Sequence, residues 1–561
     1  MIEILICSLF TNVTIYGCGY IFSNSLLIKN NKITFSSLFY VYFIGTIILS
    51  FIALFINFFS PLSSVVNSIL YVLIFFLFLI KSKVTFNKKE VKFLIISSII
   101  TFLLIIYSNV NRPDAGLYHL PYISILNDYK IIFGITNIHY RFGHISIMQY
   151  LSAVNKNFFF PTESITIPLA SIISFFYIYF FNNILRVFKK KDRINSEKFF
   201  SLFILIYIAY KISNYSNFGN DIVGNISFFY LISIILSSNL NKIDLNKILI
   251  TSVFIFLNKT ILGVVLLVPM LIFFIQQKIN IKKLFLTLVS FPSLFLYLWL
   301  LKNIIVSGCL IFPLKISCFE KLQWTNSEKI IHARLEGEAW SKAWPDRLNK
   351  NISEVNYIKD LNWIDTWSNT HLKKILEILF PYLLIIFSTT IFFLKKNKKI
   401  FIKISHSKKI INSYNVAFFI CIIGLISFFQ FPLYRFSFSY TISFIALFFI
   451  FFLKQKKFDY YNLNIFKFFF ILCAFVIVSK QLYRVYNIET FGEPWPKIYD
   501  FLTNKSSVKE KKFISEKFFY YFSNKGDTLC MYGYSPCSNY LIEKNTEYKK
   551  LYSYSFIVLS K

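Results

Sequence analysis

SNVNRPDAGLYHLPYISILNDYKIIFGITNIHYRFGHISIMQY, residues 108–150, interrupts a chain that consists mostly of long apolar runs. It directly follows one such run, 93–107, which contains no charged residue, and it carries Asp114 and three of the six histidines. A charged side chain just beyond a membrane-spanning helix is costly unless water or a partner stabilises it. We therefore expect a functional loop at the membrane surface, held in place by the helices around it.

The composition outside this stretch is typical of a helical membrane protein. Of the 561 residues, 56% are hydrophobic and only 16% are charged, whereas soluble domains usually carry about a quarter charged residues. Many apolar runs reach the roughly 17–25 residues of a transmembrane helix, and they lack the alternation of a membrane β-barrel. The net charge of +33 does not indicate nucleic acid as a partner, because the lysines form short clusters between apolar runs.

The apolar runs predict an all-α polytopic fold with about twelve to fourteen transmembrane helices. The first run lacks the basic start and the cleavage site of a signal peptide, so we expect it to be a retained span. The pair 245–257 and 260–276 is short and could be one bent element followed by a re-entrant one. The candidate spans are 2–22, 36–59, 63–81, 92–107, 164–185, 199–213, 222–238, 245–257, 260–276, 284–303, 373–394, 414–430, 436–453 and 463–480.

Basic clusters between the runs predict the orientation. If these clusters lie inside, then a first long loop (108–162), a second long loop (304–371) and the tail (481–561) all face outward. We expect a transmembrane domain, 1–480, and a small extracytoplasmic α/β appendage, 481–561, in a multi-pass protein of the bacterial inner membrane. The basic clusters are 81–92, 186–198, 278–283, 395–409 and 454–457. In the tail, 494–503 and 507–523 predict helices, and 527–534 and 553–560 predict strands.

Four of the eight cysteines lie in regions that this orientation places outside. Cys309 and Cys318 belong to the second long loop, and Cys530 and Cys537 belong to the tail. Disulfides persist outside the cytoplasm, so we predict disulfides for these cysteines. A zinc site is the alternative, but no nearby histidine supports it.

The second long loop contains five of the seven tryptophans. Residues 327–344 predict a helix that begins at Ser327, with Trp340 and Trp344 one turn apart on the same face. The rings could anchor an interfacial helix, as aromatic belts do. They could equally form a lid that stacks on a sugar or on a polyprenyl chain, and the two interpretations are compatible.

Asp114 is the first candidate catalytic residue. Pro113 interrupts any helix that continues from the preceding span, and Gly116 allows close backbone approach, so the carboxylate lies on an irregular segment. It could accept a proton from a hydroxyl, or bind a divalent cation such as Mg²⁺ or Mn²⁺. The alternative is an N-cap for a helix over 115–128. His119 could assist proton transfer or bind phosphate, or be a satisfied interfacial histidine.

Two further sets of polar residues are candidates for substrate binding. His139, Arg141 and His144 form the basic cluster HYRFGH, in which Arg141 suits bidentate binding of phosphate; ordinary lipid headgroup contact is the alternative. No Walker loop, GxGxxG, HExxH or paired CxxC motif is present, so soluble-type nucleotide or zinc-protease chemistry has no support.

The second set lies near membrane depth, where ionisable groups are functional candidates by default. It consists of Asp221, Lys259 and Arg435. Lys259 and Arg435 could neutralise a phosphate or diphosphate leaving group, or could simply extend towards the membrane surface.

A long first outer loop with an Asp soon after a transmembrane helix, later outer loops and a small outer C-terminal region resemble the GT-C superfamily of integral membrane glycosyltransferases. The segment PDAGLYHLPYI…KIIFGITNIHYRFGHIS, within 113–146, also resembles an uncharacterised bacterial family of multispanning proteins related to that fold. The SGC…C segment matches more loosely.

The resemblance implies a polyprenyl-phosphate-linked donor and transfer of a hexosyl or pentosyl group at the outer face. The acceptor is expected to be a glycan, lipid or protein of the cell envelope, and Asp114 the base of an inverting mechanism. The chain has no DxD or adjacent acidic pair there, so the resemblance does not extend to metal dependence.

A polysaccharide polymerase, a lipid-linked oligosaccharide flippase or another transporter is the alternative function. A transporter is expected to carry polar groups deep in several spans and to have short outer loops. Here the polar groups concentrate in long loops, which favours an enzyme.

Overall fold

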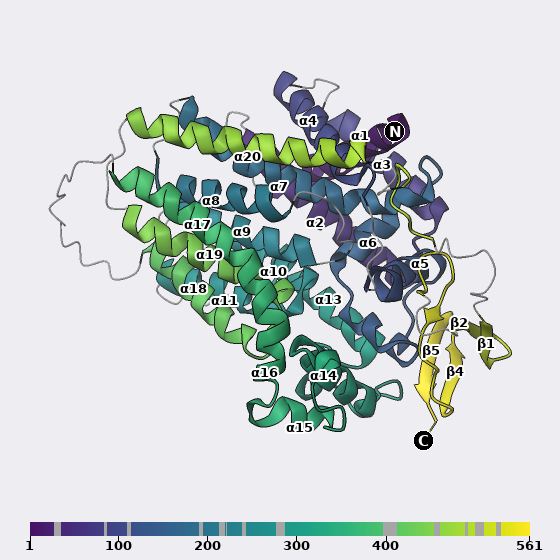
Figure 1. The fold of residues 1–561 in the computed structure, drawn as a ribbon. Helices are drawn as coiled ribbons and strands as arrows, with labels where there is room; N and C mark the ends of the chain where they lie inside the picture. Colours follow the sequence, from purple (N-terminus) through teal and green to yellow (C-terminus); the bar gives the residue numbers. More distant parts are fainter. Residues whose placement is uncertain are drawn as a thin grey trace.

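Long apolar helices form a bundle, and short helices and small β-sheets cover part of its surface (Figure 1). The computed structural model describes residues 1–26, 35–82, 87–108, 114–189, 194–212, 219, 221–237, 240, 243–276, 286–395, 412–453, 460–487, 492–499, 510–522 and 529–560. The predicted basic clusters 278–283 and 454–457, and all of 395–409 except Lys395, lie outside these residues.

Seven helices in the described part of the chain are long and apolar enough to cross a membrane. They are α1 (Ile2–Leu26), α2 (Phe35–Phe59), α3 (Ser64–Ser82), α7 (Ile167–Phe188), α17 (Lys373–Lys395), α19 (Tyr434–Leu453) and α20 (Tyr460–Tyr486). The chain is therefore a multi-pass helical membrane protein. The larger predicted number of twelve to fourteen spans stays a prediction.

Shorter helices lie at the remaining predicted spans. The apolar ones are α9 (Asp221–Ser237), α10 (Leu245–Asn258), η6 with α11 (Thr260–Leu266 and Leu267–Gln276), α13 (Phe291–Ser307) and α18 (Ser413–Phe428). Two further helices are α4 (Lys88–Ile105) and α8 (Ser196–Lys211). Helices α10 and α11 run antiparallel to each other, so that the end of α11 lies beside the start of α10. Ser146 of the first long loop donates to Asn258 Oδ1 (3.1 Å), whereas Gln276 donates to the carbonyl of Ile243, just before α10 (2.9 Å).

Close approach of α1 and α2 depends on glycine. A Cβ at Gly19 would lie 1.9 Å from the carbonyl oxygen of Val41, and one at Gly45 would lie 1.9 Å from that of Ile15. Small residues of this kind let the backbones of membrane helices touch. Asn12 of α1 adds a polar contact, because its side-chain amide donates to Ser98 of α4 (3.0 Å).

The first long loop folds against the bundle and is largely buried. Its elements are η1 (Ala115–His119), α5 (Leu120–Asp128), η2 (Ile135–Asn137), η3 (Tyr140–His144), α6 (Ile147–Val154) and η4 (Thr162–Thr166). Asn127 ties it down by donating to the carbonyls of Leu62 (2.7 Å) and Ala153 (2.9 Å). The helix predicted over 115–128 is present, although its first turn is a π-helix.

The second long loop contains η7 (Lys315–Ser317), α14 (Ser327–Ser341), η8 (Trp344–Asp346), α15 (Glu354–Ile358), η9 (Lys359–Leu361), α16 (Ile364–Trp367) and η10 (Ser368–Leu372). The N-cap of α14 is Asn326, which accepts from the Lys329 backbone N–H (2.9 Å), and not the predicted Ser327. The helix ends before Trp344 because Ala343 is left-handed, with φ +68°. Trp340 and Trp344 therefore do not share a helix face, which corrects the prediction.

The tail forms two small sheets. In one, β1 (Glu510–Ser515) pairs antiparallel with β2 (Phe518–Phe522), which pairs with β3 (Cys537–Ser538); in the other, β4 (Thr546–Leu551) pairs with β5 (Tyr554–Leu559). The helix predicted over 507–523 is wrong for the described residues 510–522, which form β1 and β2. The side chains of β2 alternate between buried and half-buried, which is the period of a strand. The strand predicted over 553–560 is confirmed by β5, whereas the described part of 527–534 is irregular. The described part of 494–503 is not helical, which corrects that prediction too.

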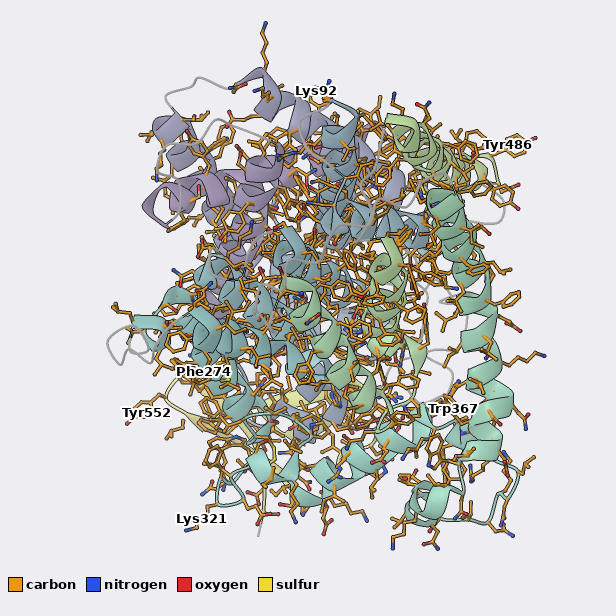
Figure 2. The ribbon with its side chains drawn as sticks, turned by 90° about the vertical axis from the view of Figure 1, so that its left-hand side faces the viewer. Lys92, Phe274, Lys321, Trp367, Tyr486 and Tyr552 are labelled. Carbon is orange, nitrogen blue, oxygen red and sulfur yellow. A yellow bond between two sulfur atoms is a disulfide. The ribbon has the colours of Figure 1, made fainter. Side chains whose placement is uncertain are left out.

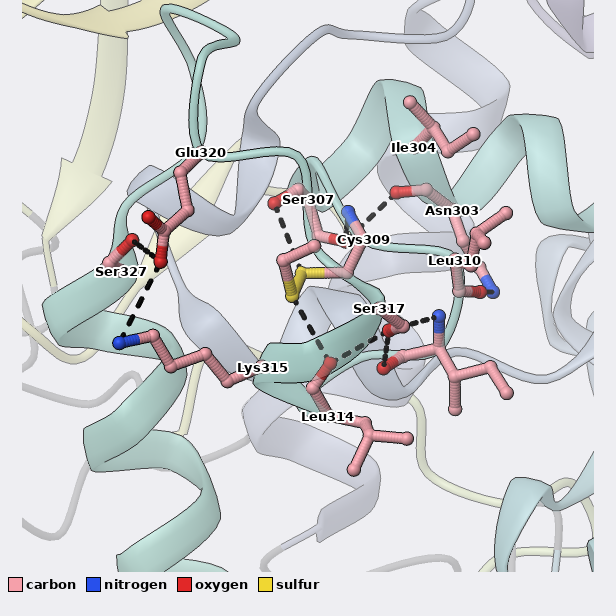
Figure 3. Close-up of a disulfide and its surroundings, with 12 residues drawn as sticks. Asn303, Ile304, Ser307, Cys309, Leu310, Leu314, Lys315, Ser317, Glu320 and Ser327 are labelled. Atoms are coloured by element: carbon pink, nitrogen blue, oxygen red, sulfur yellow. Dashed lines mark hydrogen bonds and ion pairs between the residues drawn. A yellow bond between two sulfur atoms is a disulfide. The ribbon is translucent and has the colours of Figure 1, made fainter.

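The four loop and tail cysteines pair as Cys309–Cys318 and Cys530–Cys537 in two disulfides. Figure 3 shows the first, beside Asn303, whose amide donates to the carbonyl of Leu310 (2.8 Å). The remaining four cysteines are buried and free.

The tail is docked on both long loops. Phe556 of β5 stacks on Phe133 of the first loop, with ring centroids 4.2 Å apart. Glu543 of the tail forms an ion pair with Lys329 of α14 (3.4 Å). Figure 2 shows Lys321 of the second loop and Tyr552 of the tail on the side of the molecule opposite Lys92 of α4.

Candidate functional site

Asp114 lies between two arginines from distant parts of the chain. Its Oδ2 contacts Arg435 Nη1 at 2.5 Å, and its Oδ1 lies 3.5 Å from Arg141 Nη1. The side chain makes no capping hydrogen bond to the helix that follows, and the residue itself has helical φ and ψ. The capping alternative is therefore wrong, because both carboxylate oxygens face cations.

These cations determine the protonation of Asp114. Burial by itself would raise the pKa of the carboxyl group, but Arg435 and, less strongly, Arg141 lower it below the ordinary value. The carboxylate is therefore ionised at neutral pH. One quarter of its side chain (25%) is exposed.

A second ion pair lies next to the first. Lys259, at the C-terminal end of α10, forms an ion pair with Asp221, the first residue of α9, and donates to the carbonyl oxygen of Arg435 (3.1 Å). Asn225 supports this junction by donating to the carbonyl of Asp221 (2.7 Å) and accepting from the Ser439 backbone N–H (3.2 Å). An acid at a helix N-terminus and a cation at a C-terminus are each favoured by the helix dipole.

Arg435 has the opposite placement, since it is the second residue of α19. The N-terminus of a helix carries positive partial charge, so a cation there is unfavourable unless an anion is close. Here the carboxylate of Asp114 supplies that anion. Arg435 and the helix end together attract negative charge, while 49% of the Arg435 side chain stays exposed.

We call Asp114, Arg141, Asp221, Lys259 and Arg435 the charged cluster. Glu336 of α14, which sequence reasoning missed, extends it. Its Oε1 lies 3.4 Å from Arg141 Nη2. No spacing or motif in the sequence links Glu336 to Arg141, so only the packing of α14 on η3 reveals the contact.

The three histidines of the first loop have different roles. Burial lowers the pKa of both His119 and His144 to about 4, although the nearby carboxylate of Asp114 acts in the opposite direction. His144 also packs edge-on against Phe312, at 5.1 Å between ring centroids. His139 is structural instead. Its Nδ1 accepts from the Arg141 backbone N–H (3.1 Å), so its Nε2 donates to Asn539 Oδ1 (2.8 Å).

The tryptophans make other contacts. Trp344 packs against the guanidinium of Arg347, 3.7 Å from the ring centroid, and edge-on against Tyr357. Trp340 is 53% exposed. The predicted lid over a sugar or a polyprenyl chain stays a prediction. In the described part of the chain, no three His, Cys, Asp or Glu side chains group closely enough to hold a metal ion.

The fold and the site define a class, that of multi-pass helical membrane proteins in which charged side chains from five segments meet at the helix ends. More specifically, the chain belongs to the family described as Domain of unknown function (DUF8201), whose model matches residues 1–442. The whole charged cluster lies within that range, whereas α20 and the two sheets lie beyond it. No curated protein and no solved structure matches the chain.

Proposed function

We propose that the protein is a membrane glycosyltransferase that moves a sugar from a polyprenyl-phosphate donor to an envelope acceptor at the outer face of the inner membrane. The observation that carries the proposal is the pairing of Asp114 with both Arg141 and Arg435, beside Lys259. It combines a carboxylate with three cations at helix ends, next to apolar helices that can hold a polyprenyl chain.

The cations suit the phosphate of such a donor. Arginine binds phosphate with a planar, bidentate fork, and the N-terminus of α19 adds positive partial charge. In the structure, Asp114 occupies the position of an anion between Arg141 and Arg435. A phosphate that enters competes for these two side chains and leaves the carboxylate less strongly paired.

This competition would also prepare the carboxylate as a base. Paired with two arginines, Asp114 has a lowered pKa and is a weak proton acceptor. Negative charge from the phosphate raises the pKa of a neighbouring carboxyl group. The acceptor hydroxyl oxygen then attacks the anomeric carbon, its proton moves to Asp114, and the bond from that carbon to the phosphate oxygen breaks. The carrier leaves as polyprenyl phosphate.

The test is complementation of a deletion strain, with the envelope glycans and the lipid-linked sugars measured by mass spectrometry. Asp114→Asn should lower transfer by at least about 100-fold, the usual contribution of a general base, and lipid-linked sugars should accumulate. Asp128→Asn is the matched control, since Asp128 lies in the same loop but pairs with Lys156 (3.9 Å). Full activity of the Asp114 variant would rule out its role as the base.

One observation favours the alternative, a flippase or other transporter. Lys302 of α13 is 0% exposed, and its amine has no hydrogen-bond partner among the residues that the structure describes. Its Nζ lies 3.7 Å from the ring centroid of Trp299. Buried ionisable groups in membrane helices often mark pathways for ions or protons. Translocation of a fluorescent lipid-linked sugar in proteoliposomes, lost in Lys302→Met but not in Asp114→Asn, would support transport.

A further inference from the structure

Gln149 is held in one orientation by the start of α6. Ser146 is the N-cap of this helix, and its hydroxyl accepts from the Met148 backbone N–H (2.9 Å). The Ser146 backbone N–H in turn donates to Gln149 Oε1 (2.9 Å). Ser146 and Gln149 are buried, so this reciprocal pair of hydrogen bonds fixes the orientation of the Gln149 side-chain amide. Its oxygen, Oε1, accepts the hydrogen bond at the start of α6, so its nitrogen must face the opposite side.

The nitrogen of the same amide faces His119. Gln149 Nε2 lies 2.9 Å from His119 Nδ1. An amide nitrogen is only a donor, so Nδ1 must accept with its lone pair. The imidazole proton is then on Nε2. A doubly protonated ring would place an N–H against the N–H of Gln149, and burial of His119 disfavours the charged form as well.

The other ring nitrogen, Nε2, lies beside Gly219, two residues before Asp221 of the charged cluster. A Cβ at position 219 would lie 3.1 Å from His119 Nε2, so Gly219 leaves room beside this atom. Asp114, Asp221, Arg435 and Lys259 all act electrostatically on His119. Within the described part of the chain, no hydrogen bond satisfies Nε2, although Nδ1 is satisfied.

We infer that Gln149 is a positioning residue that holds His119 as the neutral Nε2–H tautomer, and that this N–H donates to a non-bridging oxygen of the donor's phosphate. The inference rests on the proposed function for the identity of the ligand. It replaces the expectation that His119 transfers a proton, because the only nitrogen with a lone pair is engaged by Gln149. The neutral donor complements the cations, since it contributes a directed hydrogen bond without further charge.

Gln149→Glu is an informative variant, because glutamate at this position keeps the reciprocal bond to Ser146. It replaces the amide donor beside Nδ1 with an acceptor, and so moves the proton to Nδ1. Nitrogen-15 NMR of histidine-labelled protein in lipid nanodiscs reports the tautomer, with the His119 signal assigned from a His119→Asn variant. At pH 7 we expect Nε2–H in the wild type and protonated Nδ1 in Gln149→Glu. A wild-type ring protonated on Nδ1 would overturn the inference.

Farnesyl phosphate is the ligand probe, and farnesol is its control without phosphate. We expect farnesyl phosphate to shift the His119 Nε2 resonance, and its affinity to fall about 10- to 100-fold in His119→Asn, as for loss of a hydrogen bond to a charged group. His119→Gln, which retains a donor near the Nε2 position, should recover part of that affinity. An equal shift with farnesol, or an unchanged affinity in His119→Asn, would overturn the role of the donor.

These measurements separate the inference from the proposed function. Tautomer and phosphate binding are observed without any sugar transfer. A protein that binds farnesyl phosphate through His119 but transfers no sugar would contradict the transferase proposal and leave the inference supported.

Discussion

The first long loop should lose stability as the pH falls below neutrality, because it holds three uncharged histidines, of which His119 and His139 are buried and His144 is half-buried. Burial lowers the pKa of His119 and His144 to about 4 and that of His139 to about 3. In the unfolded chain a histidine titrates at about 6.5. Between these values the unfolded state binds protons that the folded state does not. The contribution of these histidines to the free energy of unfolding is therefore complete above about pH 6.5, and it decreases as the pH falls below that value.

The size of the effect follows from linkage. Each histidine contributes about 1.4 kcal/mol per pH unit in this window, so three together contribute about 4 kcal/mol per unit. Between pH 6.5 and pH 5 the loss is about 6 kcal/mol. That is comparable with the roughly 5–15 kcal/mol by which native proteins are usually stable.

Thermal unfolding of the purified protein in detergent, followed by tryptophan fluorescence at half-unit steps from pH 8 to pH 5, measures this loss. His139→Asn should reduce the slope by about a third, in proportion to the groups that remain. His332→Asn is the control, because that side chain on α14 is 61% exposed. An unfolding temperature that stays constant from pH 7 to pH 5, or a His139 variant with the wild-type slope, would refute the reasoning.

Three further predictions concern stability. Replacing Cys530 and Cys537 by serine should lower the free energy of unfolding by about 2–3 kcal/mol, as expected for a short closed loop, and limited proteolysis should then cleave the tail first; an unchanged cleavage pattern would contradict this. Asn127→Leu removes the hydrogen bonds to the carbonyls of Leu62 and Ala153, to which Asn67 also donates, and leaves the Tyr532 hydroxyl without its acceptor. We therefore expect a loss of about 1–3 kcal/mol in thermal or denaturant unfolding. Lys302→Met removes a buried amine that has no hydrogen-bond partner among the described residues, and it should leave the unfolding temperature equal or higher; a large decrease would show that Lys302 is paired.

Local composition was sufficient to predict the helices of the bundle. A run of apolar residues is costly in water wherever it lies, so the helices α1, α2 and α3 follow from hydropathy alone. Composition was not sufficient in the tail. There the pattern over 507–523 predicts a helix, but the aromatic residues of β2 are alternately buried and half-buried and pair with a strand that the local pattern does not identify.

What the sequence by itself determined is the class of protein and the types of residue from which a site can be built. What only the tertiary structure decided is which of these residues meet. Asp114 and Arg435 are 321 positions apart and in contact, whereas Trp340 and Trp344 are four positions apart and on different elements. The physical reason is that hydropathy and helix propensity are local properties. Contacts between charges depend on how helices pack, and that packing is decided by the whole chain.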